Sequence, residues 1–293
     1  MSSQNYRSVT FVGIGAIGLP MAQQIQAGGF DVTGVDPFEA PRAKAEAAGL
    51  RAAADAASAA LAQTVVVMVA TPDQLRTAAL GDTGLVATMT PGSTLIVMST
   101  VGPEPVREVA AAAQQRGIGV LDVPVTGGVA RAVTGSLTLF ASGPSADIEA
   151  NRAVLETMGS IFVCGEEIGM GQSFKAVNQL LCSVHIVAAA EALAFAGKLG
   201  LDPATVLPAI ESGAAGSWML SDRGPRMLEG IDATVTSTIA IFVKDSSMVS
   251  DIADDLGFDA PLVKAAKAAY LAAREAGLEL RDDSQVIRTY LDD

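Results

Sequence analysis

The feature that most constrains the fold is an alternation, through the first half of the chain, of short apolar runs with alanine-rich stretches. Continuous apolar strands separated by helices are typical of a parallel sheet that is covered on both faces. The predicted strands are residues 9–12, 32–35, 65–69, 95–98, 120–123, 137–140 and 161–163. This pattern predicts an α/β fold with a doubly wound, Rossmann-type sheet.

The strand signals stop after residue 163, and the rest of the chain has a helical pattern. An unusually long helix is predicted over residues 172–199, ended by Gly200, and Asp202-Pro203 then starts another helix with a cap residue and a proline in the first turn. At about 150 residues per domain, 293 residues suggest two domains. We therefore expect an α/β domain over 1–164 and an all-α domain over 165–293, joined by the long helix.

Composition excludes several classes of function. The net charge of −13 disfavours binding to nucleic acid or anionic membranes, so any anionic ligand must be held by local geometry. The longest uncharged helical stretch, residues 176–190, is shorter than the roughly 20 residues that span a bilayer, which predicts a cytoplasmic protein. Two cysteines and one histidine cannot form a disulfide framework or a four-ligand zinc site, so no metal is expected.

A glycine motif follows the first predicted strand and opens a helix. It consists of Gly13, Ile14, Gly15, Ala16, Ile17 and Gly18. In this context the glycines allow a tight turn, a close approach to a pyrophosphate and close packing of helix on strand. Asp36 ends the second strand, where its carboxylate can bind the ribose hydroxyls of NAD and repel the extra phosphate of NADP. NAD is therefore favoured over NADP, since no basic residue follows before Arg42.

The candidate proton acceptor is Lys175, at the start of the long helix. A dehydrogenase needs a base beside the carbon that yields hydride, and the single histidine, His185, lies in an apolar helix that favours a packing role. Helical spacing places Asn178 and Gln179 near Lys175, so the three could converge on a small polar ligand near the domain junction. A solvated charge at a helix end is an equally good interpretation of Lys175 from the pattern alone.

Two further polar segments lie where predicted strands end. Thr126, Gly127 and Gly128 could hold a carboxylate through backbone N–H groups and a hydroxyl, although the segment is also a plausible turn. Ser99 and Thr100 close another strand on the same side, which suits the nicotinamide end of the cofactor. We expect Ser99 to contact the substrate, and Thr71 and Thr100 to contact the cofactor.

These elements, in this order, resemble the β-hydroxyacid dehydrogenase family, which includes 3-hydroxyisobutyrate dehydrogenase and relatives of 6-phosphogluconate dehydrogenase. The resemblance rests on five segments in register, namely residues 11–22, Ser99-Thr100 with Pro103, residues 124–128, residues 169–178 and residues 242–245. It implies that Lys175 is the general acid/base and that Thr126, Gly127 and Gly128 hold the substrate carboxylate. It also implies that Thr100 lies by the nicotinamide and that Lys244 reaches the cofactor.

The chain departs from the family pattern in ways that bear on the substrate. Gln179 stands where the family commonly has Asn, and Thr126 where Ser is common. Residues 185–192, the loop 216–219 and Asp282-Asp283-Ser284 look most like the L-threonate dehydrogenase branch. Trp218, the single tryptophan, is either a wall of the substrate cleft or a packing anchor. The resemblance therefore favours hydride transfer between NAD and a four-carbon sugar acid.

Other functions stay open. Within the family, the chain could act as a 3-hydroxyisobutyrate dehydrogenase or a tartronate semialdehyde reductase, whereas imine reductases usually lack the lysine. From a different class, the chain could be a nucleotide-binding sensor without turnover, although Lys175 and residues 126–128 would then be unneeded. The alanine- and leucine-rich helices of the second half, together with the resemblance, predict a homodimer or homotetramer.

Overall fold

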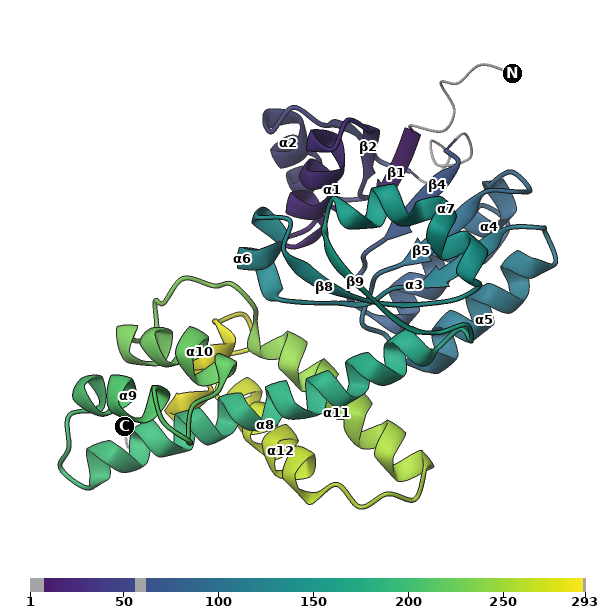
Figure 1. Ribbon diagram of the computed structural model, residues 1–293. Coiled ribbons are helices and arrows are strands. Elements are labelled where there is room, and N and C mark those ends of the chain that lie inside the picture. The colour runs from purple at the N-terminus through teal and green to yellow at the C-terminus, as the bar shows by residue number, and fades with distance from the viewer. Residues whose placement is uncertain (1–7, 56–61, 292–293) are drawn as a thin grey trace. The chain divides into compact units, whose positions relative to one another are not determined.

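The computed structural model describes residues 8–55 and 62–291 and divides the chain into two compact units, Met1–Lys175 and Ala176–Asp293. Helix α8 (Met170–Lys198, Figure 1) crosses the division, which falls after its sixth residue, Lys175. The predicted domain limits, 1–164 and 165–293, remain a prediction. Each unit is described by itself below.

Unit 1 is built on a nine-stranded sheet with the order β3-β2-β1-β4-β5-β6-β8-β7, to which β9 adds beside β8. The strands are β1 (Ser8–Val12), β2 (Asp31–Val35), β3 (Arg51–Ala53), β4 (Thr64–Val67), β5 (Thr94–Val97), β6 (Gly119–Asp122), β7 (Val125–Thr126), β8 (Leu137–Ser142) and β9 (Gly159–Gly165). The pairs from β3 to β6 are parallel, and this run of six has the strand order of a dinucleotide-binding fold.

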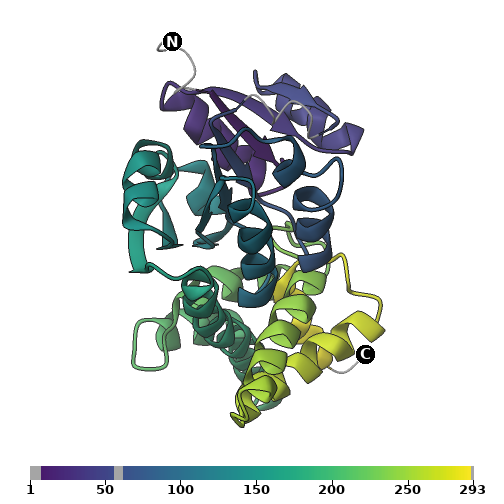
Figure 2. The same ribbon diagram turned by 90° about the vertical axis from the view of Figure 1, so that its right-hand side faces the viewer.

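Helices cover both faces of this sheet (Figures 1 and 2). They are α1 (Gly18–Ala27), α2 (Glu39–Ala47), α3 (Pro72–Ala79), α4 (Leu85–Thr88), α5 (Pro103–Gln114), α6 (Gly128–Val133) and α7 (Ser145–Glu156). Strand β4 explains the two layers, because Val66 packs into one core with α1 and α7 while Val65 and Val67 pack into the other with α3 and α5. The predicted doubly wound α/β architecture is confirmed.

Two features of the sheet differ from the prediction of a parallel sheet with seven strands. Strand β8 runs antiparallel to β6 and β7, because the chain reverses through α6 directly after β7. Strands β3 and β7 were not predicted, since three and two residues are too few to produce a periodic signal.

Unit 2 is helical, as the sequence predicts. It contains most of α8, then α9 (Pro203–Glu211), α10 (Trp218–Glu229), α11 (Ile239–Asp255), α12 (Pro261–Glu275) and a 3-10 helix, Asp283–Thr289. Asp202 caps α9 by accepting a hydrogen bond from the Ala204 N–H, which confirms the predicted start. The core centres on the fully buried Tyr270, whose ring stacks on Phe242.

Helix α8 agrees with the helix predicted over 172–199 to within two residues at each end. Its 29 residues include a window that, by length and composition alone, could cross a membrane, because single charges do not interrupt such a window. The helix is therefore long and apolar enough to span a bilayer by these criteria, which corrects the expectation from the uncharged residues 176–190. Of that window 44 % is buried inside the protein, and a core helix of a soluble protein meets the same criterion.

Candidate active site

The glycines of the loop between β1 and α1 serve two purposes. Gly13 and Gly18 are needed for packing, whereas Gly15 leaves room for a ligand. A Cβ on Gly13 would lie 2.2 Å from the Met68 carbonyl oxygen, and one on Gly18 would lie 1.9 Å from that of Gly13, so both positions require glycine for packing. A Cβ on Gly15 would meet nothing within 4 Å. The missing side chain at Gly15 therefore leaves an open cradle at the N-terminus of α1, which fits a pyrophosphate.

Asp36 follows β2 and is buried, with its Oδ1 accepting a hydrogen bond from the Phe38 N–H at 3.0 Å. Arg42, the first basic residue beyond it, donates to the carbonyl oxygens of Asp36 and Pro37, each at 2.8 Å. These bonds hold the guanidinium against the backbone beside the carboxylate. Thr71 caps α3, accepting from the Gln74 N–H at 3.1 Å.

The loop after β5 is held by one side chain from the first turn of α8. Gln172 accepts hydrogen bonds at Oε1 from the N–H groups of Val101 (3.0 Å) and Gly102 (3.1 Å), and its Nε2 donates to the Ser99 carbonyl oxygen (2.9 Å). The Ser99 hydroxyl is fully buried and accepts from the Val69 N–H. Thr100, half-buried, lies between the backbone groups that Gln172 holds.

Asp122 ends β6 and is fully buried. Its Oδ2 accepts from the backbone N–H groups of Gly169 (3.1 Å) and Gln172 (3.0 Å) and from the Ser142 hydroxyl (3.2 Å), while Oδ1 accepts from Gln172 Nε2 (2.9 Å). Burial raises the pKa of Asp122 above its ordinary value, although the hydrogen bonds from Gln172 oppose this shift. The Asp122 carboxylate thus caps the start of α8, and the groups that donate to it are all uncharged.

Thr126, Gly127 and Gly128 form the turn from β7 into α6. Both glycines have positive φ angles, +129° and +67°, which glycine adopts readily. A Cβ on Gly127 would collide with the Arg131 side chain, whereas one on Gly128 would meet nothing within 4 Å. Gly128 therefore resembles Gly15 in leaving its backbone open to close approach.

Lys175 lies on α8, three residues after Gln172, and only 6 % of it is exposed. This burial excludes the interpretation of Lys175 as a solvated charge at a helix end. His185, further along the same helix, is half-buried.

In unit 2, four side chains form a chain of polar contacts. Asn178 Nδ2 donates to Gln179 Oε1 (2.8 Å), and Gln179 Nε2 donates to Asp245 Oδ2 (2.5 Å). The other oxygen of Asp245 lies 2.7 Å from Lys244 Nζ. The two candidate amides and the candidate cofactor lysine are thereby linked through Asp245, a residue that the sequence analysis did not single out.

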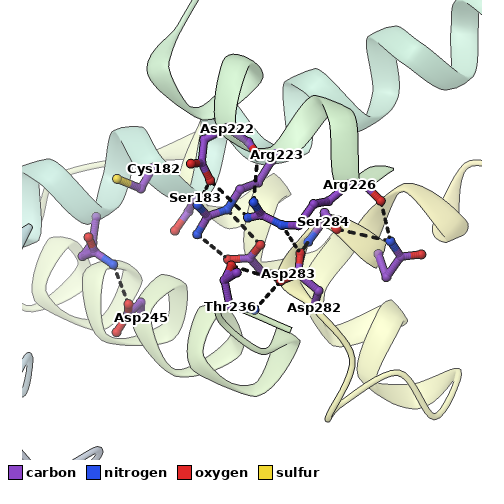
Figure 3. A network of polar contacts seen from close by, with 12 residues as sticks. Cys182, Ser183, Asp222, Arg223, Arg226, Thr236, Asp245, Asp282, Asp283 and Ser284 are labelled. Atoms are coloured by element: carbon purple, nitrogen blue, oxygen red, sulfur yellow. Dashed lines mark hydrogen bonds and ion pairs between the residues drawn. The ribbon is translucent and has the colours of Figure 1, made fainter. Parts of the chain in front are cut away.

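A second polar network in unit 2 joins α10 to the 3-10 helix (Figure 3). Arg223 grips Asp283 through two hydrogen bonds of 2.9 and 2.8 Å and also pairs with Asp222. Arg226 pairs with Asp282 at 3.0 Å. Trp218 is 45 % exposed at the start of α10, with the Arg223 guanidinium carbon 5.9 Å from its ring centroid.

Burial raises the pKa of Asp283 to about 6, although the Arg223 guanidinium lowers it. Burial acts on Asp282 as well, but hydrogen bonds from Ser284 and Thr236 and the pair with Arg226 lower its pKa overall. Within residues 8–55 and 62–291, no group of three or more His, Cys, Asp or Glu side chains could hold a metal ion.

The structure places the predicted residues in local groups. Unit 1 carries Gly13, Gly15, Ala16, Ile17, Gly18, Asp36, Thr71, Ser99, Thr100, Thr126, Gly127, Gly128 and Lys175; unit 2 carries Asn178, Gln179, Trp218 and Lys244. The sequence analysis missed Gln172 and the role of Asp122. A signal did exist, because Asp122 ends a strand on the side where the other candidates lie.

Two family comparisons together span residues 8–290. The NAD-binding domain of 6-phosphogluconate dehydrogenase matches residues 8–169. The NAD-binding domain described for NADP-dependent 3-hydroxyisobutyrate dehydrogenase matches residues 169–290.

Among characterised relatives, an L-threonate dehydrogenase of Cupriavidus necator is 36 % identical over 97 % of this chain and 96 % of its own. One from Haemophilus influenzae is 34 % identical over 99 % and 97 %. A crystal structure of 3-hydroxyisobutyrate dehydrogenase from Salmonella typhimurium superposes with a TM-score of 0.89 at 34 % identity, covering 96 % of this chain and 99 % of that one.

Proposed function

Because this chain belongs to the β-hydroxyacid dehydrogenase family, with the NAD-binding domain of 6-phosphogluconate dehydrogenase, we propose that it oxidises a small polar hydroxy acid with Lys175 as the general acid/base. One observation carries the role of Lys175. The side chain is buried on α8, three residues after the glutamine that holds the loop at Thr100. A buried amine on the helix that holds this loop suits proton transfer better than it suits solvation.

The residues at the glycine loop fit NAD. The N-terminus of α1 and the open backbone at Gly15 would hold the pyrophosphate, and the Asp36 carboxylate would hold the ribose hydroxyls. Bound NAD supplies the hydride acceptor for the oxidation. Asp36 would repel the additional phosphate of NADP, and Arg42 is held by backbone carbonyls beside it.

Lys175 carries the proton step. In oxidation, its neutral amine takes the proton of the substrate hydroxyl as the carbon yields hydride. In reduction, its ammonium returns that proton to the carbonyl oxygen. Oxidation therefore requires the neutral amine, and reduction the ammonium.

The substrate is held by neutral groups. Thr126 and the backbone N–H groups of Gly127 and Gly128 would bind its carboxylate, and Gly128 leaves room for close approach. Asn178 or Gln179 would orient the hydroxyls; the two amides are hydrogen-bonded to each other, and Gln179 also donates to Asp245. These polar contacts favour an L-threonate-like four-carbon acid, in keeping with the activity named for several relatives.

The first experiment is a substrate panel with NAD. We expect NADH to form faster with L-threonate than with 3-hydroxyisobutyrate or with glycerate-type acids. 3-Hydroxyisobutyrate would suit a more apolar site. A preference for 3-hydroxyisobutyrate would replace the substrate while keeping the family chemistry. Tight NADH binding without turnover on any acid would favour a sensor.

The second experiment tests Lys175. Lys175→Ala should lower kcat by about 10²-fold or more while NADH still binds, because acid–base catalysis and cofactor binding are separable. Lys198→Ala, at the exposed end of the same helix, is the control and should keep its turnover. Wild-type turnover in Lys175→Ala would end the proposed role.

The assembly is part of the same proposal. Phe174, Val177 and Leu181 are exposed at spacings of three and four residues on α8, so they form an apolar stripe that suits a homodimer or homotetramer in the cytoplasm. Light scattering should give a mass of two or four chains. A monomer at micromolar concentration would contradict it.

A further inference from the structure

Three segments of unit 1 meet at one buried pair of side chains. The carboxylate of Asp122 and the carboxamide of Gln172 lie 2.9 Å apart, and neither residue is more than 1 % exposed. Through them, the end of β6, the first turn of α8 and the loop at residues 99–102 are hydrogen-bonded to one another.

The orientation of Gln172 is unique. Its Oε1 faces two backbone N–H groups, and its Nε2 faces the Ser99 carbonyl oxygen and the Asp122 carboxylate. A flipped carboxamide would set donors against donors and acceptors against acceptors at all four contacts. The pair therefore admits one arrangement of the loop relative to the helix.

The groups that Gln172 holds lie on both sides of Thr100. One is the carbonyl of the preceding residue and the others are the N–H groups of the two following residues. Lys175 lies three residues further along the helix that Asp122 caps. A Cβ on Gly171 would lie 2.5 Å from the Phe140 carbonyl oxygen and 2.8 Å from that of Asp122, so the helix start has little room to shift.

We propose that Asp122 and Gln172 are positioning residues that hold the Thr100 loop in register with Lys175. This inference rests on the proposed function, since it takes Thr100 as the neighbour of the nicotinamide and Lys175 as the proton carrier. Neither residue touches the reacting atoms. They act by keeping the cofactor side and the proton side of the reaction at a fixed separation, where a misplacement of about 1 Å is able to cost 10²-fold in rate.

The test compares two buried carboxamides of unit 1. Gln172→Met removes the polar head while keeping the length of the side chain. Asn151→Leu is the matched control, because Asn151 is also buried and accepts from the Thr64 hydroxyl at 2.9 Å. Thr64 and Thr94, its partners, begin β4 and β5, so Asn151 lies at the opposite ends of the strands from the loop at Ser99.

Both variants should lower the melting temperature, because each leaves buried polar partners without a hydrogen bond. Only Gln172→Met should lower kcat, by tenfold or more at saturating NAD and L-threonate, with the Kd of NADH within threefold of wild type. 3-Hydroxyisobutyrate replaces L-threonate if the wild type prefers it. Equal kcat per folded molecule in the two variants would overturn the proposal.

Gln172→Glu supplies a second readout if the methionine variant does not fold. A protonated glutamic acid keeps an acceptor toward Val101 and Gly102 and one donor, whereas the ionised form repels Asp122. The kcat of this variant relative to wild type should therefore fall as pH rises, while Gln114→Glu, an exposed change on α5, follows the wild-type profile. A flat ratio contradicts the proposal, as does a failure of both Gln172 variants to fold when Asn151→Leu folds.

Lys175→Ala distinguishes this inference from the function on which it rests. If Lys175→Ala keeps full turnover, the proposed function fails and the positioning role falls with it. If Lys175→Ala is inactive while Gln172→Met is fully active, the function stands and only the positioning role is wrong.

Discussion

The two units bury carboxylates in opposite ways. In unit 1, Asp122 is surrounded by neutral N–H and O–H donors from two segments, the end of β8 and the start of α8. In unit 2, Asp283 is held by the guanidinium of Arg223, and Asp282 by the guanidinium of Arg226 together with N–H and O–H donors of Thr236 and Ser284. Neutral donors fix directions, whereas paired charges mainly offset each other's desolvation. The first arrangement suits the alignment of loops and the second the attachment of the C-terminal segment to α10.

The largest expected effect is in the ionic network. Asp283→Ala leaves the Arg223 guanidinium, whose side chain is only 8 % exposed, with one carboxylate partner fewer, and should lower the free energy of unfolding by about 3–5 kcal/mol. Urea unfolding followed by the fluorescence of Trp218, the only tryptophan, reports on this unit directly. The double variant Arg223→Met with Asp283→Leu should recover most of the loss. A double variant as unstable as the single one would break the contrast between charge pairing and directed bonding.

The pH dependence of stability is the next effect. The pKa of Asp283 is about 6 in the folded protein against 3.8 ordinarily, so its contribution to stability is complete below pH 3.8 and is lost as pH rises through 6. At 1.36 kcal/mol per pKa unit this amounts to about 3 kcal/mol. The unfolding free energy of wild type minus that of Asp283→Asn should therefore fall between pH 4 and 7. A constant difference over this range would contradict the assignment.

Asp122→Asn probes the neutral cluster. Its single oxygen can serve the three donors at the Oδ2 position, but its amide then faces Gln172 Nε2. We expect a loss of about 1–3 kcal/mol in stability together with a roughly tenfold fall in kcat. Thermal melting and steady-state rates at saturating substrate measure the two effects. A stability loss of this size with unchanged kcat would show that the Asp122 cluster, like the cluster at Asp282 and Asp283, contributes to stability alone.

Gly15→Ala separates ligand from fold within unit 1. Because a Cβ there meets no protein atom, the melting temperature should stay at the wild-type value while the Kd of NADH rises about tenfold, or about 1.4 kcal/mol. Gly18→Ala should show the reverse, since its Cβ would meet a carbonyl oxygen at 1.9 Å. Fluorescence titration with NADH gives both affinities. Equal affinities for Gly15→Ala and wild type would contradict binding of NADH at the open backbone of Gly15.

Features that depend on residues close in sequence were predicted, whereas pairings between residues far apart in sequence were not. The glycine turn between the first strand and the first helix, the parallel part of the sheet and the long helix follow from residues close in sequence, and each is confirmed. Arg223 and Asp283 are 60 positions apart, and Asp122 and Gln172 are 50 apart, so no spacing rule brings them together. Strands β3 and β7 were not predicted, because such short segments are strands only through their hydrogen-bonded pairing with neighbouring strands.

The role of Lys175 is tested most directly by a single turnover of enzyme with bound NAD and excess L-threonate, followed by NADH absorbance in wild type and Lys175→Ala. If Lys175 carries the proton, NAD occupies both proteins equally and the fast phase is at least 10²-fold slower in the variant. A fast phase of unchanged rate in Lys175→Ala would contradict this role.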